Sequence, residues 1–130
     1  NCTSFELYKG VLRDKSTGVF NGKVIVAVDA QKIEAYQQNK NIILSREATM
    51  NAKPELEIFA DDVKCSHGCT IGQIDDDALF YMRTRGISKE DAKTILTFAF
   101  ASEAVEKLSI DELSEITKQE MKKKLNLSLN

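Results

Sequence analysis

The stretch from Asp61 to Ser88 reads DDVKCSHGCTIGQIDDDALFYMRTRGIS and contains the point at which the chain changes character. Before Gly72 the chain carries short apolar runs rich in β-branched residues, whereas after it the periodicity becomes helical. The same stretch holds the only histidine, His67, and two of the three cysteines, Cys65 and Cys69. It therefore bears on both the fold and the chemistry of the protein.

The β-branched runs before Gly72 are separated by Gly, Asn and Asp, a pattern typical of strands. Asn21-Gly22 is interpreted as a turn, and Pro54 as a residue just before a strand, where its missing N–H costs no ladder bond. The polar segment from Tyr36 to Asn41 is interpreted as a loop or corner. Many short strands without intervening helices predict an all-β layer, either a sandwich or a β-helix. The runs are Gly18–Phe20, Lys23–Val28, Ile42–Leu44, Leu56–Ala60 and Val63–Ser66.

Helices are expected after Gly72. The three aspartates from Asp75 to Asp77 place negative charge at a helix start, where backbone N–H groups are unpaired and the dipole is positive. They could instead form a metal or acid–base cluster, but capping is the more common use and is favoured here. Gly86 is expected to end this first helix.

Two further helices are predicted from capping-box-like pairs of residues. Ser88 with Asp91 opens the second helix, and Ser109 with Glu112 opens the third. The apolar residues of the second helix nearly encircle it, so that helix must be covered on more than one side. The basic residues Lys122 to Lys124 suit the last turn of the third helix.

The composition excludes several classes of function. With 130 residues, 42% of them hydrophobic and 29% charged, the chain can bury one core. A formal net charge of −2 offers no excess of cations for a nucleic acid. No apolar run approaches the roughly 20 residues that a membrane helix needs.

An odd number of cysteines argues against a disulfide framework and fits a reducing cytosol. Because the chain opens on Asn1 rather than Met, we expect it to be a piece of a longer protein.

The alternation of Cys65, His67 and Cys69 admits several interpretations. Residues two apart on a strand share a face and lie about 6.6 Å apart. Cys65 and His67 can therefore converge on one metal ion, with bonds of about 2.3 and 2.0 Å. A buried strand is the commoner use of such residues, since free cysteine is among the most buried residue types. A Cys–His nucleophile pair lacks a visible orienting residue and an oxyanion device. A glycine often breaks the alternation of a strand, so we expect Gly68 to turn Cys69 away from the other two.

A resemblance to a known family favours the metal-binding interpretation of Cys65 and His67. The segment KPELEIFADDVKCSHGCTIGQIDDDALFYMRTRGIS, from Lys53 to Ser88, is very similar to the SufB/SufD family of iron–sulfur cluster assembly proteins. GVFNGKVIV, AQKIEAYQQNKNIILS and LTFAFASE also resemble that family, and the similarity runs from about Ser4 to Leu108. The intact KCSHG favours the SufD-like branch. Cys69 stands where the family usually has a small apolar residue, so the resemblance gives Cys69 no role.

The resemblance implies a mainly β plus α fold. Residues 1–72 are expected to form the last turns of a right-handed parallel β-helix, with stacked strands over about Val11 to Thr70. Residues 73–130 are expected to form a helical C-terminal domain. The protein is then expected to be a cytoplasmic scaffold subunit that is not itself an enzyme. It would pair with a SufB-like subunit and bind a SufC-like ABC-type ATPase.

The resemblance also implies roles for particular residues. Cys65 and His67 are implied as ligands of a transient iron–sulfur cluster or iron. A cluster usually takes about four protein ligands, so a partner must share it and the isolated chain is expected to hold none. Arg83 and Arg85 are expected to be exposed for contact with the ATPase, in a helix whose core residues are Leu79 and Phe80.

Two other classes of protein stay open from the residues alone. One is a metal- or thiol-dependent enzyme built on Cys65 and His67, which would need an enclosed pocket with further polar groups. The other is a purely structural module. A homodimer of the isolated chain also stays open.

Overall fold

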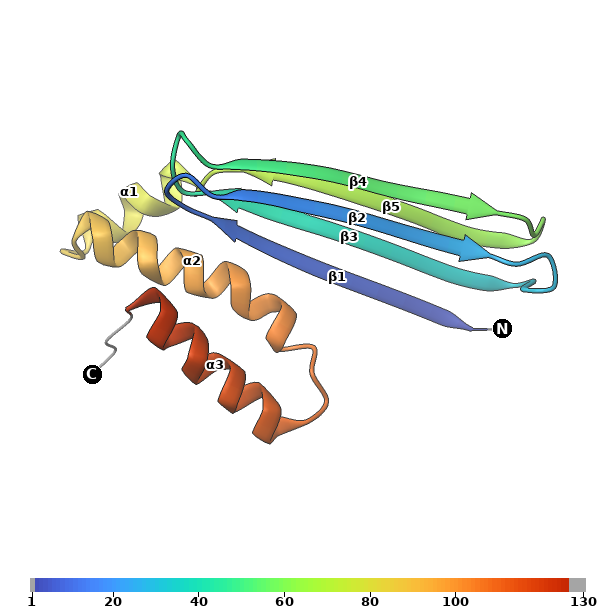
Figure 1. Cartoon of the computed structure of the whole chain (residues 1–130). Coiled ribbons are helices and arrows are strands. Elements are labelled where there is room, and N and C mark those ends of the chain that lie inside the picture. Colours follow the sequence, from blue (N-terminus) through green and yellow to red (C-terminus); the bar gives the residue numbers. More distant parts are fainter. Residues whose placement is uncertain (1, 127–130) are drawn as a thin grey trace. The chain divides into compact units, whose positions relative to one another are not determined.

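The computed structural model describes residues 2–126. The chain divides into two compact units, Asn1–Gly72 and Gln73–Asn130. All the strands of the described residues lie in the first unit, and all the helices lie in the second (Figure 1). The predicted change from strands to helices after Gly72 is therefore confirmed.

The first unit, here called the β unit, consists of two parallel sheets. One sheet has the order β1-β3-β5 and the other pairs β2 with β4. The chain alternates between the sheets, and Figure 1 shows that the strands of the two sheets run in opposite directions. The strands are longer than the sequence runs indicated. Their bounds are β1 Thr3–Leu12, β2 Thr17–Val26, β3 Ile33–Ile43, β4 Thr49–Ile58 and β5 Val63–Gly72.

The register of the sheets shows a regular repeat. Thr3 of β1 pairs with Glu34 of β3, and Thr17 of β2 pairs with Thr49 of β4. Ile33 of β3 in turn pairs with Val63 of β5. The chain thus returns to the same sheet after about 31 residues, stacking each strand in parallel on the one before it.

The two sheets enclose a narrow interior. The rings of Tyr8 on β1 and Phe20 on β2 lie 4.9 Å apart between their centroids. A methyl group at Gly18 would come within 2.8 Å of both Leu12 and Met50. Side chains from both sheets therefore meet across this interior, which buries apolar residues near its ends. The most deeply buried apolar residues of the unit are Leu12, Val26, Ala35, Ile42, Ala48 and Ala60.

The prediction of a loop from Tyr36 to Asn41 is wrong. These residues lie in the middle of β3, whose backbone pairs with β1 on one side and β5 on the other. Gln37, Asn39 and Asn41 are only 3%, 3% and 2% exposed. Their spacing of two residues, rather than their polarity, reports their structure, because every second side chain of a strand points to the same face.

The interpretations of Asn21-Gly22 and Pro54 are also wrong. Both lie inside strands, and Gly22 of β2 pairs directly with Pro54 of β4. Among the described residues β4 has only this one neighbouring strand, and an edge strand tolerates proline because one of its sides makes no ladder bonds. Gly22 is needed for space rather than for a turn, since the amide oxygen of Gln37 packs against it.

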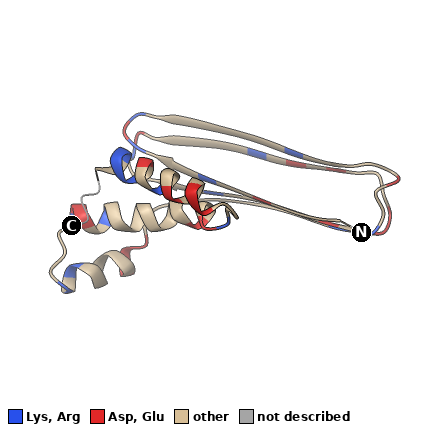
Figure 2. Ribbon diagram, turned by 90° about the horizontal axis from the view of Figure 1, so that it is seen from below, with Lys and Arg blue, Asp and Glu red and all other residues tan. Residues whose placement is uncertain are grey.

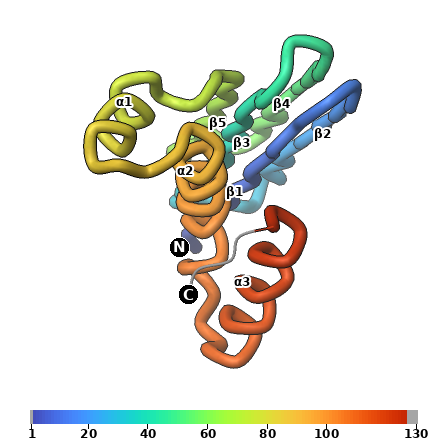
Figure 3. Tube along the Cα trace, turned by 90° about the vertical axis from the view of Figure 1, so that its left-hand side faces the viewer, coloured from blue at the N-terminus to red at the C-terminus, as the bar shows by residue number. Residues whose placement is uncertain are grey.

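The second unit contains α1 Asp76–Thr84, α2 Lys89–Val105 and α3 Asp111–Leu125 (Figure 3). The carboxylate of Asp75 caps α1 by accepting from the N–H groups of Asp77 at 2.9 Å and Ala78 at 3.4 Å. Gly86 follows the helix with a φ of 85°, the left-handed conformation that glycine adopts most readily. Both predicted boundaries of α1 are confirmed.

The capping pair of α2 is confirmed, whereas that of α3 is wrong. Ser88 Oγ accepts from the N–H of Asp91 at 3.1 Å. The third helix begins after Ile110, which makes no side-chain capping bond. The start of α3 is acidic and its end is basic, as Figure 2 shows, so the helix dipole is stabilised at both ends without the predicted cap. None of the helices in the described part has the length and apolar character needed to cross a membrane.

Candidate metal-donor strand

The candidate site lies on β5, the last strand of its sheet. The backbone of β5 pairs with β3 along its whole length, including Gly68, which pairs with Gln38. Within residues 2–126 no strand pairs with the other side of β5. The donor residues are therefore carried by a regular strand with one open edge.

Cys65, His67 and Cys69 share one face of this strand and are here called the donor row. The thiol of Cys69 donates to Oδ1 of Asn39 at 3.5 Å, and Asn39 is buried in the interior between the sheets. Because alternate residues share a face, Cys65 and His67 point to the same side as Cys69. The prediction that Gly68 turns Cys69 away is wrong, since Gly68 keeps the strand in register instead of forming a bulge.

The side chains of the donor row are at least partly accessible, and neither of its cysteines forms a disulfide. Cys65 is half-buried, whereas His67 and Cys69 are exposed. All three cysteines of the chain are free thiols. No side-chain hydrogen bond ties Cys65 or His67 to any other described residue. The exposure of His67 disfavours the buried-strand interpretation, because a histidine in a dry core would need an internal partner.

The donor row fits a shared metal site rather than a complete one. Neighbouring donors lie about 6.6 Å apart along the strand, close enough for two side chains to reach one ion. Over residues 2–126 no group of three or more His, Cys, Asp or Glu side chains is placed to hold a metal ion. Any iron or cluster held at Cys65 and His67 would need further ligands from outside this set.

A second polar row lies behind the donors on β3. In the register of the sheet, Gln37 stands beside His67 and Asn39 beside Cys69. Nε2 of Gln37 donates to the carboxylate of Glu6 at 2.8 Å. Nδ2 of Asn41 donates to Oδ1 of Asn39 at 2.6 Å. Sequence reasoning missed this row, although its spacing of two residues is the same as that of the donors on β5.

The buried amide side chains of this second row, Gln37, Asn39 and Asn41, lower the stability of the β unit. Oε1 of Gln37 and Oδ1 of Asn41 are buried without a hydrogen-bond partner, which costs roughly 1–3 kcal/mol for each group. Two glycines make room for them, because a methyl group at Gly10 or Gly22 would collide with Asn41 or Gln37. These two oxygens are exceptions to the rule that buried polar groups are hydrogen-bonded.

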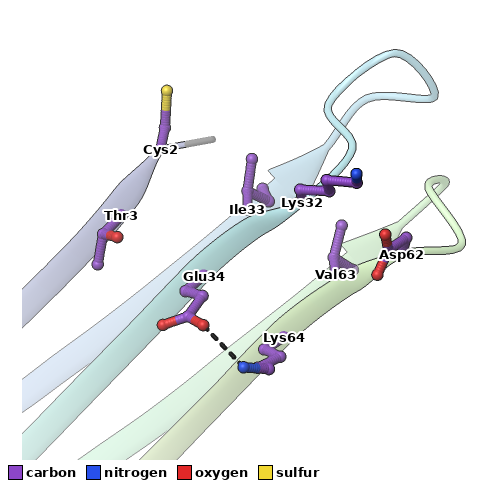
Figure 4. A pocket seen from close by; sticks show the side chains of 8 residues that line it. All are labelled: Cys2, Thr3, Lys32, Ile33, Glu34, Asp62, Val63 and Lys64. Carbon is purple, nitrogen blue, oxygen red and sulfur yellow. Dashed lines mark hydrogen bonds and ion pairs between the residues drawn. The ribbon is translucent and has the colours of Figure 1, made fainter.

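One pocket lies near the donor row without including it. It has a volume of about 540 Å³ and lies at the starts of β1, β3 and β5 (Figure 4). Nζ of Lys64 contacts Oε1 of Glu34 there at 2.9 Å, and this hydrogen bond and charge raise the pKa of the Lys64 amine above its usual value. The pair is exposed, so it adds little stability. Neither Cys65 nor His67 lines this pocket.

The fold and the donor row define a class: a protein of two parallel sheets with thiol and imidazole side chains on an open edge strand. Residues 1–100 match the family model described as "SUF system FeS cluster assembly, SufBD core domain". The chain belongs to the SufB/SufD family of iron–sulfur cluster assembly proteins.

Three relatives from this family are similar to most of this chain. SufD of Escherichia coli K12 is 45% identical over 114 residues, which cover 88% of this chain and 27% of that protein. A SufBD family protein of Synechocystis is 44% identical over 108 residues, covering 83% and 24%. SufD of Bacillus subtilis is 34% identical over 105 residues, covering 81% and 24%. The resemblance to SufD is confirmed, and the chain spans about a quarter of the length of these relatives.

Proposed function

We propose that this chain is part of a SufD-like subunit of a cytoplasmic iron–sulfur cluster assembly scaffold. Cys65 and His67 would hold nascent cluster or iron, as cargo, at an interface with a SufB-like subunit. The observation that carries the proposal is the placement of two accessible donors on an open edge strand. The proposal assigns the subunit no catalytic step of its own.

The incomplete donor set supports a shared site. Cys65 and His67 supply at most two of the roughly four ligands that a cluster takes. The open edge of β5 offers unpaired backbone groups, which a strand of another subunit can pair with. A partner that docks along this edge would bring its own ligands to the donors of β5. It would also cover the thiols, which soluble proteins rarely leave exposed.

We also propose that the β unit belongs to a right-handed β-helix. Its support is the repeat of about 31 residues, in which the chain visits both sheets before it stacks the next parallel strand. Connections between parallel strands of one sheet are right-handed in about 98% of cases. The open edges of β1 and β2 would then continue the stack in the longer protein.

The first helix is proposed as the surface for a SufC-like ATPase. Arg83 and Arg85 are both exposed. The guanidinium of Arg85 donates to the Tyr81 hydroxyl at 2.8 Å and lies 5.0 Å from the centre of its ring. The expectation that Phe80 is a core residue is wrong, since it is 69% exposed, while Leu79 is half-buried. Exposed aromatic residues beside arginines are typical of protein interfaces.

Co-purification tests the proposed function. The full-length protein, expressed with a SufB-like and a SufC-like partner, is expected to elute from a sizing column as one complex containing all three chains. Elution of the protein alone, as a monomer or a homodimer, in the presence of both partners would contradict the proposal.

Charge reversal tests the ATPase surface. Arg83→Glu with Arg85→Glu is expected to weaken binding of the SufC-like ATPase by about 30-fold, since losing charged interface partners costs about 2 kcal/mol or more. Calorimetry on the full-length protein would measure this affinity. The matched control is Arg13→Glu with Arg46→Glu, two exposed arginines of the β unit. Equal affinities for the two double variants would show that α1 is only structural.

A further inference from the structure

We propose that Cys69 is a second thiol partner for His67, so that His67 can share a metal ion with either Cys65 or Cys69. This inference rests on the proposed function and extends it to a residue for which the family resemblance gives no role. It assigns to this chain two overlapping metal positions on one strand, with His67 common to both.

The geometry on the two sides of His67 is equivalent. Cys65 precedes His67 by two residues and Cys69 follows it by two residues, on an unbroken strand. Each thiol therefore lies on the imidazole's face of the strand at a spacing of about 6.6 Å. Whatever metal the first pair can reach, the second pair can reach by the same side-chain lengths.

The two thiols cannot serve one ion together. Cys65 and Cys69 lie about 13 Å apart along the strand. Metal–sulfur bonds of about 2.3 Å, added to the short cysteine side chains, do not span that separation. The ion must therefore occupy one position or the other. Moving between the two positions exchanges one sulfur ligand and keeps the histidine.

The surroundings make the two positions unequal. Cys65 stands beside the methyl group of Ala35, whereas Cys69 stands beside Asn39 and donates to its Oδ1 at 3.5 Å. Asn39 is itself held by Nδ2 of Asn41 at 2.6 Å. A metal ion that binds Cys69 takes the place of the thiol proton, which passes to water, and ends this contact. No electron is transferred. Cys65 is thus the readier thiol, and Cys69 is the one that takes over when Cys65 is occupied or absent.

The test uses Co²⁺ as the probe, added under anaerobic conditions to the full-length protein without partners; unlike a cluster, a single ion can take water in place of the ligands that a partner would supply. Cobalt–thiolate charge-transfer absorption reports each metal–sulfur bond, and difference spectra against Cys65→Ser with Cys69→Ser remove the contribution of thiols elsewhere. Cys65→Ser alone is expected to keep a one-thiolate band and Co²⁺ affinity within about threefold of wild type. The double variant, which is the spectral reference, is expected to bind Co²⁺ at least about tenfold more weakly than the wild type. Cys2→Ser, which removes the thiol outside the row, is the control and should match wild type.

Several outcomes would overturn the inference. If Cys65→Ser already behaves like the double variant, Cys69 is not a donor. Two thiolates per cobalt in the wild type would refute the exchange of positions, and so would a wild type without any band. Alanine variants at the same positions, with their melting temperatures, exclude an effect of misfolding. Because the titration needs no partner, its failure is distinct from a failure of the complex to assemble.

Discussion

Gly22→Ala is expected to lower the free energy of unfolding by about 1–3 kcal/mol, the usual cost of forcing a methyl group into a packed interior. The new carbon would lie 2.5 Å from Oε1 of Gln37 and 2.6 Å from Cζ of Phe20. Neither group can yield easily, because Gln37 is tied to Glu6 and the Phe20 ring packs on Tyr8. Urea denaturation of the full-length protein would measure the change.

Gly68→Ala provides a matched control within the same unit. A methyl group at Gly68 would meet nothing within 4 Å, and its backbone is not in the left-handed region. This change is expected to be neutral or stabilising by up to about 1 kcal/mol, because alanine restricts the unfolded chain. Equal losses at Gly22 and Gly68 would mean that Gln37 does not pack against β2 as described.

Local signals predicted the helices well and the strands only in part. A helix cap depends on residues within one turn, so the Asp75 and Ser88 caps could be recognised from the sequence. At Ser109 the same signal failed, because the acidic residues of the first turn of α3 stabilise the helix start without a side-chain cap. A strand in a stacked sheet depends on neighbours about 31 residues away, which no local pattern reveals.

The segment from Tyr36 to Asn41 shows why the polar interior of the β unit was not predicted. Asn39 and Asn41 are poor strand formers by propensity, yet backbone pairing on both sides holds β3 extended. For the same reason Asn21-Gly22 looked like a turn and Pro54 like a residue just before a strand, since propensity describes a residue without its neighbours. The donors of β5 could be singled out from their spacing, whereas the buried amides behind them required the register of the sheet.

The register also places two of the buried amides beside residues of the candidate site. The buried amide oxygens of Gln37 and Asn41 have no hydrogen-bond partner, which costs roughly 1–3 kcal/mol for each group. Gln37 and Asn39 stand beside the histidine and the distal cysteine of the donor row. Among the described residues, one side chain of the donor row is bonded to an amide, since the thiol of Cys69 donates to Oδ1 of Asn39 at 3.5 Å. The interior of the β unit is therefore polar at the level of His67 and Cys69.

His67→Ala is expected to separate stability from cluster assembly. The side chain is exposed and makes no side-chain hydrogen bond within the described residues, so the free energy of unfolding should change by no more than about 0.5 kcal/mol. Iron and acid-labile sulfide in the assembled complex should fall at least about tenfold. Cys65→Ala should cause a smaller fall, because no residue can replace the imidazole whereas Cys69 can replace the thiol. Ser66→Ala, an exposed neighbour on the opposite face of β5, is the control and should leave both quantities unchanged. A large loss of stability with normal cluster content would instead make His67 and Cys65 structural residues, and the proposed site would be wrong.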